Sequence, residues 1–489
     1  MTNPPDPQAK PTPTADRYWW WIGVAAAVAL LVRVVWGLWV DHPPQGLYDP
    51  ARYVGYGRVI ADGRGMIEPL SGKPTAYYPP GYPWFVGIVT WLGSPLSDSV
   101  VTLVALVQAV LGAVSVVLGA IVGRALGGRR AGIVAAFGLA LYPNLVFHSG
   151  AVLGETLYNT LFLAFCAVVV TTRWPEGLTT RRVLGTGVAL GLAVMVRPIS
   201  LAIVPVVALA WWIGTRDRQV VLRSTVVLVA AVVACIVPWT VRNAIRMDAF
   251  VPISTNTGEN LCIGHAPGAT GAFTTRSACD TETSLLDGPA GEVAADKEKQ
   301  RAGLDGIRAE PARQPGLLWK RFWYTWVNDG DHDGVIAVQS YRFDRFIAVP
   351  TERRLNYGAD LAYWVVCATG LLGAAALLRR RSGLDVFLVG SALMTAAVPL
   401  AFFGDPRFKV PVIPLLIVMA ATLAGGVWRR GSVNPARGRH STGPAAQVSR
   451  ARAPSRVARA STGASRPVPW TPPALGDTSS PDEAARSSW

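Results

Sequence analysis

Long apolar runs separated by short polar turns fill the chain between Tyr18 and Val427. A helix of roughly 20 apolar residues is long enough to cross the hydrocarbon core of a bilayer. The pattern predicts ten spans: Tyr18–Val40, Val101–Val122, Ala131–Phe147, Leu153–Thr171, Val183–Val196, Ile199–Gly214, Val220–Trp239, Leu361–Leu378, Val386–Phe403 and Val410–Val427. The fifth and sixth are short, and Pro198 between them indicates a tilted or partly immersed hairpin.

Arginine clusters set the expected orientation, because cytoplasmic loops of membrane proteins are enriched in Lys and Arg. The clusters fall on alternate ends of the spans: Arg124/Arg129/Arg130, Arg173/Arg181/Arg182, Arg216/Arg218/Arg223, Arg379/Arg380/Arg381 and Arg429/Arg430. Both termini are therefore predicted to be cytoplasmic. The apolar stretch Gly81–Leu92 has only 12 residues, and counting it as a span would move the later clusters outside. We predict that it is a helix lying at the outer interface.

The expected fold is an all-α polytopic membrane protein with about ten transmembrane helices. Two extracytoplasmic loops, 41–99 and 240–360, are expected to carry interfacial helices. The Pro-rich segment 1–17 and the Ser-, Pro- and Arg-rich segment 429–489 have little apolar content and are predicted to be disordered cytoplasmic tails. The remaining segment, 18–428, forms the transmembrane domain.

Composition agrees with a membrane protein and changes the interpretation of the charge. The chain of 489 residues is 51% hydrophobic and only 16% charged, and its mean hydropathy of +0.32 excludes a set of soluble domains. A net charge of +15 could indicate a nucleic-acid partner. The predicted topology places nearly all of that positive charge on the cytoplasmic side, so we predict no nucleic-acid partner.

The first outer loop holds the most informative polar residues. Asp49 follows the first span and is placed at the membrane surface, where a carboxylate can act as a general base. Lys73 could neutralise a phosphate. The tyrosines Tyr53, Tyr78 and Tyr82 lie in the same loop. The alternative is that Asp49 only caps a juxtamembrane helix, with the aromatic residues as interfacial filler.

Three ionisable residues lie within or beside the predicted spans. Glu155 is near the outer end of the fourth span, Arg197 precedes Pro198, and Arg33 lies in the middle of the first span. Ionisable groups inside a bilayer are costly and usually functional. We expect Glu155 and Arg197 to face a polar cavity, and Arg33 to form a structural ion pair across helices.

Two further clusters stand at predicted outer helix ends. Pro238-Trp239-Thr240-Val241-Arg242-Asn243 is followed by a polar stretch that contains Asn256, and this cluster could hold a phosphate or a sugar. Gly404-Asp405-Pro406-Arg407-Phe408-Lys409 is a short turn with two cations. The alternative for this turn is a charged hairpin between two spans.

Together these motifs resemble a known family. Their types and order are similar to the bacterial C-type (GT-C) glycosyltransferases, which are family-39-like membrane enzymes related to protein O-mannosyltransferases and aminoarabinose transferases. The resemblance covers about Tyr18–Val427. It implies that 18–428 is a catalytic domain that transfers a sugar, with inversion, from a polyprenyl-phosphate donor on the extracytoplasmic face. The acceptor would be an envelope glycan, lipid or protein.

The resemblance also implies roles for single residues. Asp49 would be the general base, and Lys73 would contact the donor phosphate. Arg242 and Arg407 would be partners of the leaving phosphate, with Arg197 and the residues Tyr53, Tyr78, Tyr82 and Asn256 as further substrate contacts. The mannosyltransferases carry an Asp-Glu pair in the first loop, whereas Pro50 follows Asp49 here. Glu155, which the predicted topology places near the same outer face, could supply the second catalytic carboxylate.

No cofactor is required by this chemistry, because a phosphate leaving group is already a good anion and cationic side chains can stabilise it. A divalent cation is left open. Asp329, Asp331 and Asp333 match the opening of a calcium-binding loop, but Ser340 stands where a bidentate Glu is expected. We interpret this segment as a solvated acidic turn and treat the three aspartates as weak metal candidates.

Cys262 and Cys279 both lie in the second outer loop, where the compartment permits disulfides. We predict that they form a bridge closing a loop of about 18 residues, which would stabilise the loop by roughly 3 kcal/mol.

A transporter or flippase of a lipid-linked envelope precursor is the main alternative function. It would require polar groups at the bilayer midplane, whereas most polar residues here collect at the outer helix ends. A membrane scaffold anchored by its basic tail would leave the outer charged residues unexplained.

Overall fold

The computed structural model describes residues 13–46, 48–274, 279, 282–330 and 344–426. All of these belong to one compact unit, Met1–Asn434, and a second unit, Pro435–Trp489, lies outside the described residues. The described part of the chain is helical, with two isolated bridges and no strand. The predicted all-α class is therefore confirmed. The predicted disordered tails fall almost entirely outside the described residues, except that the first helix already begins at Pro13.

Six helical segments are long and apolar enough to cross a membrane, as judged by length and composition. They are Arg17–Trp39 of α1 (Pro13–Trp39), α4 (Val100–Leu141), Pro198–Thr215 from η2 (Pro198–Ile203) and α8 (Val204–Thr215), α9 (Arg218–Met247), α15 (Val349–Arg380) and α16 (Gly383–Ala401). Shorter apolar helices are α6 (Glu155–Thr171) and α17 (Ile413–Ala424), and α7 (Thr180–Val196) has 17 residues. The protein is a multi-pass membrane protein, and the count of ten spans stays a prediction.

Helix α4 contains the second predicted span and most of the third, joined by a sharp break. Gly128 has φ 83°, a left-handed conformation that glycine adopts without steric cost. After it the chain folds back, so that Ala131 and Ala135 lie against Gly123. The second and third predicted spans thus form an antiparallel helical hairpin, with Arg129 and Arg130 at the turn.

Several helices continue beyond the ends that hydropathy predicts. Helix α9 runs through Pro238 to Met247, and α15 begins at Val349, well before the predicted Leu361. Hydropathy marks only the apolar part of a helix. Polar turns that extend the same helix into water are invisible to it.

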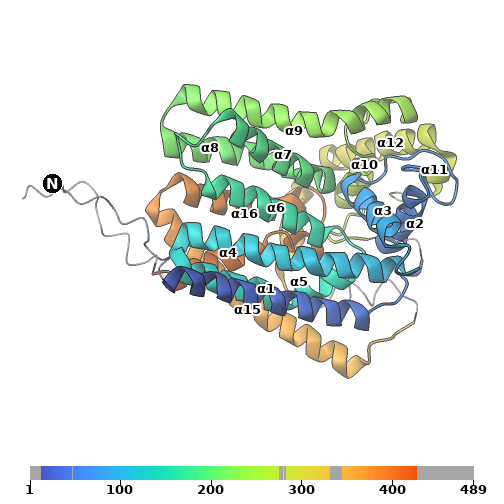
Figure 1. Cartoon of the computed structure of the whole chain (residues 1–489). Helices are drawn as coiled ribbons and strands as arrows, with labels where there is room; N and C mark the ends of the chain where they lie inside the picture. The colour runs from blue at the N-terminus through green and yellow to red at the C-terminus, as the bar shows by residue number, and fades with distance from the viewer. Residues whose placement is uncertain (1–12, 47, 275–278, 280–281, 331–343, 427–489) are drawn as a thin grey trace, which may run out of the picture. The chain divides into compact units, whose positions relative to one another are not determined.

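The long helices run alongside one another, with α1 packed along α4 and α7 along α9 (Figure 1). The helices of the two predicted outer loops gather at one end of this bundle: α2 (Asp49–Ala61), α3 (Gly81–Gly93), α10 (Thr257–His265), α11 (Glu282–Asp287) and α12 (Pro289–Ala309). Arg380 at the end of α15 donates to the Leu126 carbonyl oxygen at the turn of α4 (2.8 Å). Two of the predicted cytoplasmic arginine turns therefore lie together, as the alternating pattern requires.

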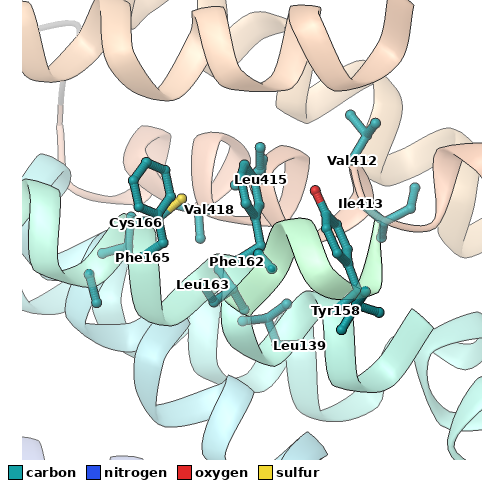
Figure 2. Close-up of a cluster of buried hydrophobic side chains, with 14 of the residues drawn as sticks. Leu139, Tyr158, Phe162, Leu163, Phe165, Cys166, Val412, Ile413, Leu415 and Val418 are labelled. Atoms are coloured by element: carbon teal, nitrogen blue, oxygen red, sulfur yellow. The ribbon is translucent and has the colours of Figure 1, made fainter. Parts of the chain in front are cut away.

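The core between α6, α4 and α17 is built from aromatic and aliphatic side chains (Figure 2). Tyr158, Phe162 and Phe165 follow one another along α6 with ring centroids 5.6 and 5.7 Å apart, and Leu415 and Val418 of α17 are buried in the same cluster. Lipid tails are as apolar as these residues, so close packing rather than water exclusion holds such helices together. Glu155 is the first residue of the same helix α6.

Candidate functional site

The turn between α16 and α17 supplies two cations. Asp405 begins it, and its carboxylate accepts a hydrogen bond from the Arg407 backbone N–H (2.9 Å). Pro406 follows at the first position of the short helix η4 (Pro406–Lys409). An Asp cap followed by Pro is a favoured helix start. The local sequence thus fixes the directions in which Arg407 and Lys409 leave the backbone.

Arg407 joins two carboxylates. Its Nη1 lies 2.7 Å from Asp49 Oδ2, and its Nε donates to Glu155 Oε1. Arg197 Nη2 lies 2.5 Å from the same Glu155 oxygen. The formal charges of these four residues cancel, and we refer to Asp49, Glu155, Arg197 and Arg407 as the four-charge cluster.

The members of the four-charge cluster differ in burial. The Glu155 side chain is fully buried, whereas that of Asp49 is 33% exposed and that of Arg407 is 18% exposed. Glu155 lies in the first turn of α6, where the helix dipole favours a negative charge. Arg197 follows the end of α7, and Pro198 after it keeps the chain from continuing that helix.

Asp49 does not act as a helix cap. It is the first residue of α2, and the capping position before it belongs to Tyr48. The Asp49 carboxylate instead accepts from the Tyr78 hydroxyl (2.5 Å) and from Arg407. The alternative interpretation as a capping residue is thus wrong, and the side chain points into the four-charge cluster.

The three predicted tyrosines pack beside Asp49. The Tyr53 ring centroid lies 4.7 Å from that of Tyr78 and 4.8 Å from that of Tyr82, and the Tyr82 hydroxyl donates to Gln108 Oε1 (3.1 Å). Burial, reinforced by the negative charge of Asp49, raises the pKa of Tyr78 well above its usual range. Tyr78 therefore remains a proton donor to the Asp49 carboxylate.

Comparisons with known proteins agree with this architecture. Residues 77–241 match the family described as dolichyl-phosphate-mannose-protein mannosyltransferase, a segment that includes Tyr78, Glu155 and Arg197. Among curated proteins, none is similar enough in sequence to count as a relative. The apo oligosaccharyltransferase of Archaeoglobus fulgidus is 15% identical with a TM-score of 0.50, and the match covers 83% of this chain and 50% of that chain. The chain has the C-type glycosyltransferase fold.

Two further solved structures are similar to it. Oligosaccharyltransferase AglB of Archaeoglobus fulgidus, in complex with an inhibitory peptide and a dolichol-phosphate, is 17% identical, with 84% of this chain and 50% of that chain covered and a TM-score of 0.49. ArnT from Cupriavidus metallidurans, bound to undecaprenyl phosphate, is 15% identical, with 83% and 77% covered and a TM-score of 0.41. The chain spans about half the length of the oligosaccharyltransferases it matches.

Unlike the arginines of the four-charge cluster, Lys73 and Arg242 donate hydrogen bonds to backbone carbonyl oxygens. Lys73 is exposed, and its Nζ donates to the carbonyl oxygen of Asp287 (3.2 Å). Arg242 donates to the carbonyl oxygens of Thr75 (2.8 Å) and Met66 (2.5 Å). Both cations tie the first outer loop to the second. Their described contacts do not join them to the carboxylates of the four-charge cluster.

Asn256 also lies in the second outer loop, immediately before α10. Its Oδ1 accepts from the Ser254 hydroxyl (2.9 Å), so the side chain shapes the turn into the helix. Within that helix, Cys262 forms a disulfide with Cys279, with Cα atoms 5.6 Å apart. The structure thus pairs the two cysteines that the sequence predicts to bridge.

Asp329 is not part of a solvated turn. It is fully buried, with Oδ1 3.2 Å from Lys409 Nζ, and its two oxygens accept from the Asn144 amide (2.9 Å) and the Tyr142 hydroxyl (2.7 Å). A buried carboxylate requires such partners. The predicted solvated acidic turn is therefore wrong at this residue, whose oxygens are already occupied by protein donors.

The remaining weak metal candidates, Asp331 and Asp333, lie outside the described residues, as does Ser340. Within the described ranges, no three or more His, Cys, Asp or Glu side chains are grouped so that they could hold a metal ion.

Arg33 hydrogen-bonds to backbone carbonyl oxygens, which differs from the predicted ion pair. Its guanidinium donates to the carbonyl oxygens of Ala140 and Leu139 (both 2.9 Å) and of Ala29 (3.3 Å). Helix α4 ends at Leu141, so Leu139 and Ala140 are among the last carbonyls, which have no partner within the helix. Backbone oxygens of α4 thus hold the cation where a carboxylate was expected.

Several buried carboxylates are not singled out by the sequence, and Glu292 is one of them. Glu292 of α12 is 2% exposed and accepts from the hydroxyls of Thr75 (2.7 Å) and Thr255 (2.6 Å) and from the Ala76 N–H (2.9 Å). It thereby joins the first outer loop to the second. Burial raises its pKa. Glu292 is one acidic residue among several in a polar helix, so the sequence carries no signal that singles it out.

Proposed function

We propose that the protein is an inverting glycosyltransferase that uses a polyprenyl-phosphate sugar as donor and acts on the extracytoplasmic face. The acceptor is a hydroxyl of an envelope glycan, lipid or protein. The observation that carries the proposal is the four-charge cluster, in which the partly exposed Asp49 pairs with Arg407, while Arg407 and Arg197 share the buried Glu155. This combination supplies a base for the acceptor and cations for a phosphate leaving group.

Asp49 is the proposed general base. Tyr78 and Arg407 orient its carboxylate, and one third of the side chain remains exposed to an approaching acceptor. The acceptor hydroxyl gives its proton to Asp49 while its oxygen bonds to the anomeric carbon. The bond from that carbon to the phosphate oxygen breaks, and its electron pair leaves with the polyprenyl phosphate. A single displacement of this kind inverts the anomeric centre.

Arg407 and Arg197 are the proposed partners of the leaving phosphate. Their side chains are 18% and 19% exposed, so each presents an edge to a ligand while Glu155 holds the other edge. A bound donor phosphate competes with Asp49 for Arg407 Nη1. Donor binding thus releases an Asp49 oxygen for the acceptor proton, which couples the arrival of the donor to the availability of the base.

Glu155 is assigned a different task from Asp49. Its carboxylate is fully buried and accepts from both arginines through one oxygen. A group in that position orients the two cations and does not reach an acceptor hydroxyl. Lys73 and Arg242 stay candidate phosphate contacts from sequence, with a described role in joining the outer loops.

The lipid-linked donor has independent support. The family that matches residues 77–241 is described by a dolichyl-phosphate sugar donor. A donor held in the bilayer by a polyprenyl chain would present its phosphate near the surface. The predicted topology places the four-charge cluster at the same level, beside the outer loops.

The test is sugar transfer by purified full-length protein supplied with labelled polyprenyl-phosphate hexoses and an envelope acceptor extract. Asp49→Asn keeps the shape of the side chain but removes the base, so we expect transfer to fall by about 100- to 10,000-fold. The matched control is Asp62→Asn, which changes an exposed aspartate at the other end of α2 and should leave the rate unchanged. Transfer by Asp49→Asn within a few-fold of wild type would refute the assignment of Asp49.

A further inference from the structure

A small cavity lies within the helical bundle, one helical turn along α6 from Glu155. Its volume is about 20 Å³, which is room for roughly one water molecule. The lining includes Arg33 of α1, His148 of η1 (His148–Gly150) and Asn159 of α6, together with apolar side chains. Glu155 and Asn159 are four residues apart on α6 and therefore share one helix face.

Three polar atoms at this cavity lack a protein partner within the described part of the chain. They are Arg33 Nε, His148 Nε2 and Asn159 Oδ1. The three residues are 2%, 1% and 5% exposed, respectively. Buried polar groups in folded proteins almost always have a partner, from the protein or from ordered water.

The hydrogen-bonding character of the three atoms is fixed by their surroundings. His148 Nδ1 lies 2.9 Å from the Asn144 carbonyl oxygen, which can only accept, so Nδ1 carries the proton. Burial lowers the pKa of His148, which favours the neutral ring. His148 Nε2 is therefore an acceptor. Arg33 Nε–H is a donor and Asn159 Oδ1 an acceptor.

One donor and two acceptors complement a single water molecule. We propose that this cavity is a structural water site, in which the water accepts from Arg33 Nε–H and donates to His148 Nε2 and Asn159 Oδ1. A water in such a site makes about three hydrogen bonds. No two of the three residues belong to the same element, so the water joins α1, η1 and α6.

The site lies close to Glu155 along the chain. The chain passes from η1 into α6 in a few residues, and Glu155 is the first residue of that helix. The water would thus join the two elements that flank the connection leading to Glu155. Gly112 leaves the space for Arg33, since a Cβ at that position would overlap Arg33 Nε.

Solid-state NMR of the full-length protein in lipid nanodiscs, labelled with ¹⁵N-histidine, tests the water site. This experiment does not depend on an assay of sugar transfer. The His148 resonances are assigned by their loss in His148→Phe. We expect a neutral ring protonated at Nδ1, and magnetisation transfer from water protons to Nε2. A ring protonated at Nε2, or a charged imidazolium, would overturn the proposal, because Nε2 would then be a donor and could not accept a hydrogen bond from the water.

Two variants separate the water from a general effect on packing. Asn159→Leu removes one hydrogen-bond acceptor of the water. It should abolish magnetisation transfer from water protons to His148 Nε2, while the Nδ1–H tautomer persists. Ser115→Ala removes another polar group at the same cavity, whose hydroxyl is already bonded to Thr160 (2.8 Å), and should leave the water signal intact. Undiminished transfer in Asn159→Leu would refute the three-bond arrangement. The wild-type spectrum remains decisive if Asn159→Leu does not fold.

Discussion

Two cations that leave the same short turn meet opposite environments. Arg407 and Lys409 are two residues apart in η4, and each pairs with an aspartate. The Arg407–Asp49 pair is 18% and 33% exposed, whereas both partners of the Lys409–Asp329 pair are fully buried. The short spacing between Arg407 and Lys409 therefore does not predict that they have the same role. Their exposure to solvent distinguishes them, because Arg407 belongs to the candidate site and Lys409 to a buried structural pair.

The two pairs should also contribute differently to stability. A partly exposed ion pair is screened by water and contributes little to the free energy of unfolding. In a sealed pair, removal of one partner leaves the other charge buried without compensation. The comparison predicts that substitution of Lys409 lowers the free energy of unfolding, whereas substitution of Arg407 lowers the rate of sugar transfer and leaves the protein folded.

The largest effect is expected from Lys409→Met. It leaves the Asp329 charge buried, which should cost about 3–5 kcal/mol of unfolding free energy. Thermal or denaturant unfolding in detergent measures the loss. The double variant Lys409→Met with Asp329→Asn removes both charges and should regain part of the stability. Normal unfolding of Lys409→Met would show that the sealed pair has no structural role.

Arg407→Gln should act on transfer with little effect on folding. Removing one charge-stabilising group from the leaving phosphate should lower the transfer rate by about 100- to 1,000-fold, while Arg197 still neutralises Glu155. The control is Arg313→Gln, another partly exposed arginine paired with a carboxylate, Glu310 (2.8 Å), which should keep full activity. A large drop in melting temperature for Arg407→Gln would place Arg407 with Lys409 as a structural residue.

The smallest expected effect is on the pH dependence of stability and concerns Glu292. This buried carboxylate accepts from hydroxyl and backbone N–H donors, whereas the buried Glu155 carboxylate pairs with two arginines. Its folded-state pKa is raised above the ordinary 4.5 by burial, so folding favours the protonated form. Its contribution to stability therefore declines as the pH rises from the ordinary carboxyl pKa through the raised value. Melting temperatures of wild type and Glu292→Gln across this range should diverge, with wild type declining more. Parallel curves would contradict the raised pKa.

Much of the fold could be predicted from the sequence because the bilayer imposes long apolar helices. The ends of the helices were harder to predict, because polar turns extend α9 to Met247 and begin α15 at Val349, beyond the apolar parts of these helices. The break at Gly128 coincided with an arginine cluster, and for that reason the hairpin in α4 was visible as two spans.

The candidate site was predicted in part. Glu155 and Arg197 were singled out because ionisable residues within or beside apolar segments are costly. Asp49 and Arg407 were singled out as charged residues of polar segments at predicted outer helix ends, and the structure brings these four together. The fates of Arg33 and Asp329 could not be predicted. Their partners, Ala140 and Lys409, lie 107 and 80 residues away along the chain, and only the packing of helices brings them into reach.

The four-charge cluster also has a consequence for biosynthesis. Asp49 and Arg407 are separated by 358 positions along the chain, and synthesis proceeds from the N-terminus. Asp49, Glu155 and Arg197 all leave the ribosome long before Arg407. A chain halted after α16 would have two carboxylates for one arginine, so the cluster becomes neutral only when the turn that contains η4 is in place. The cluster is thus completed only after most of the described helices have been synthesised.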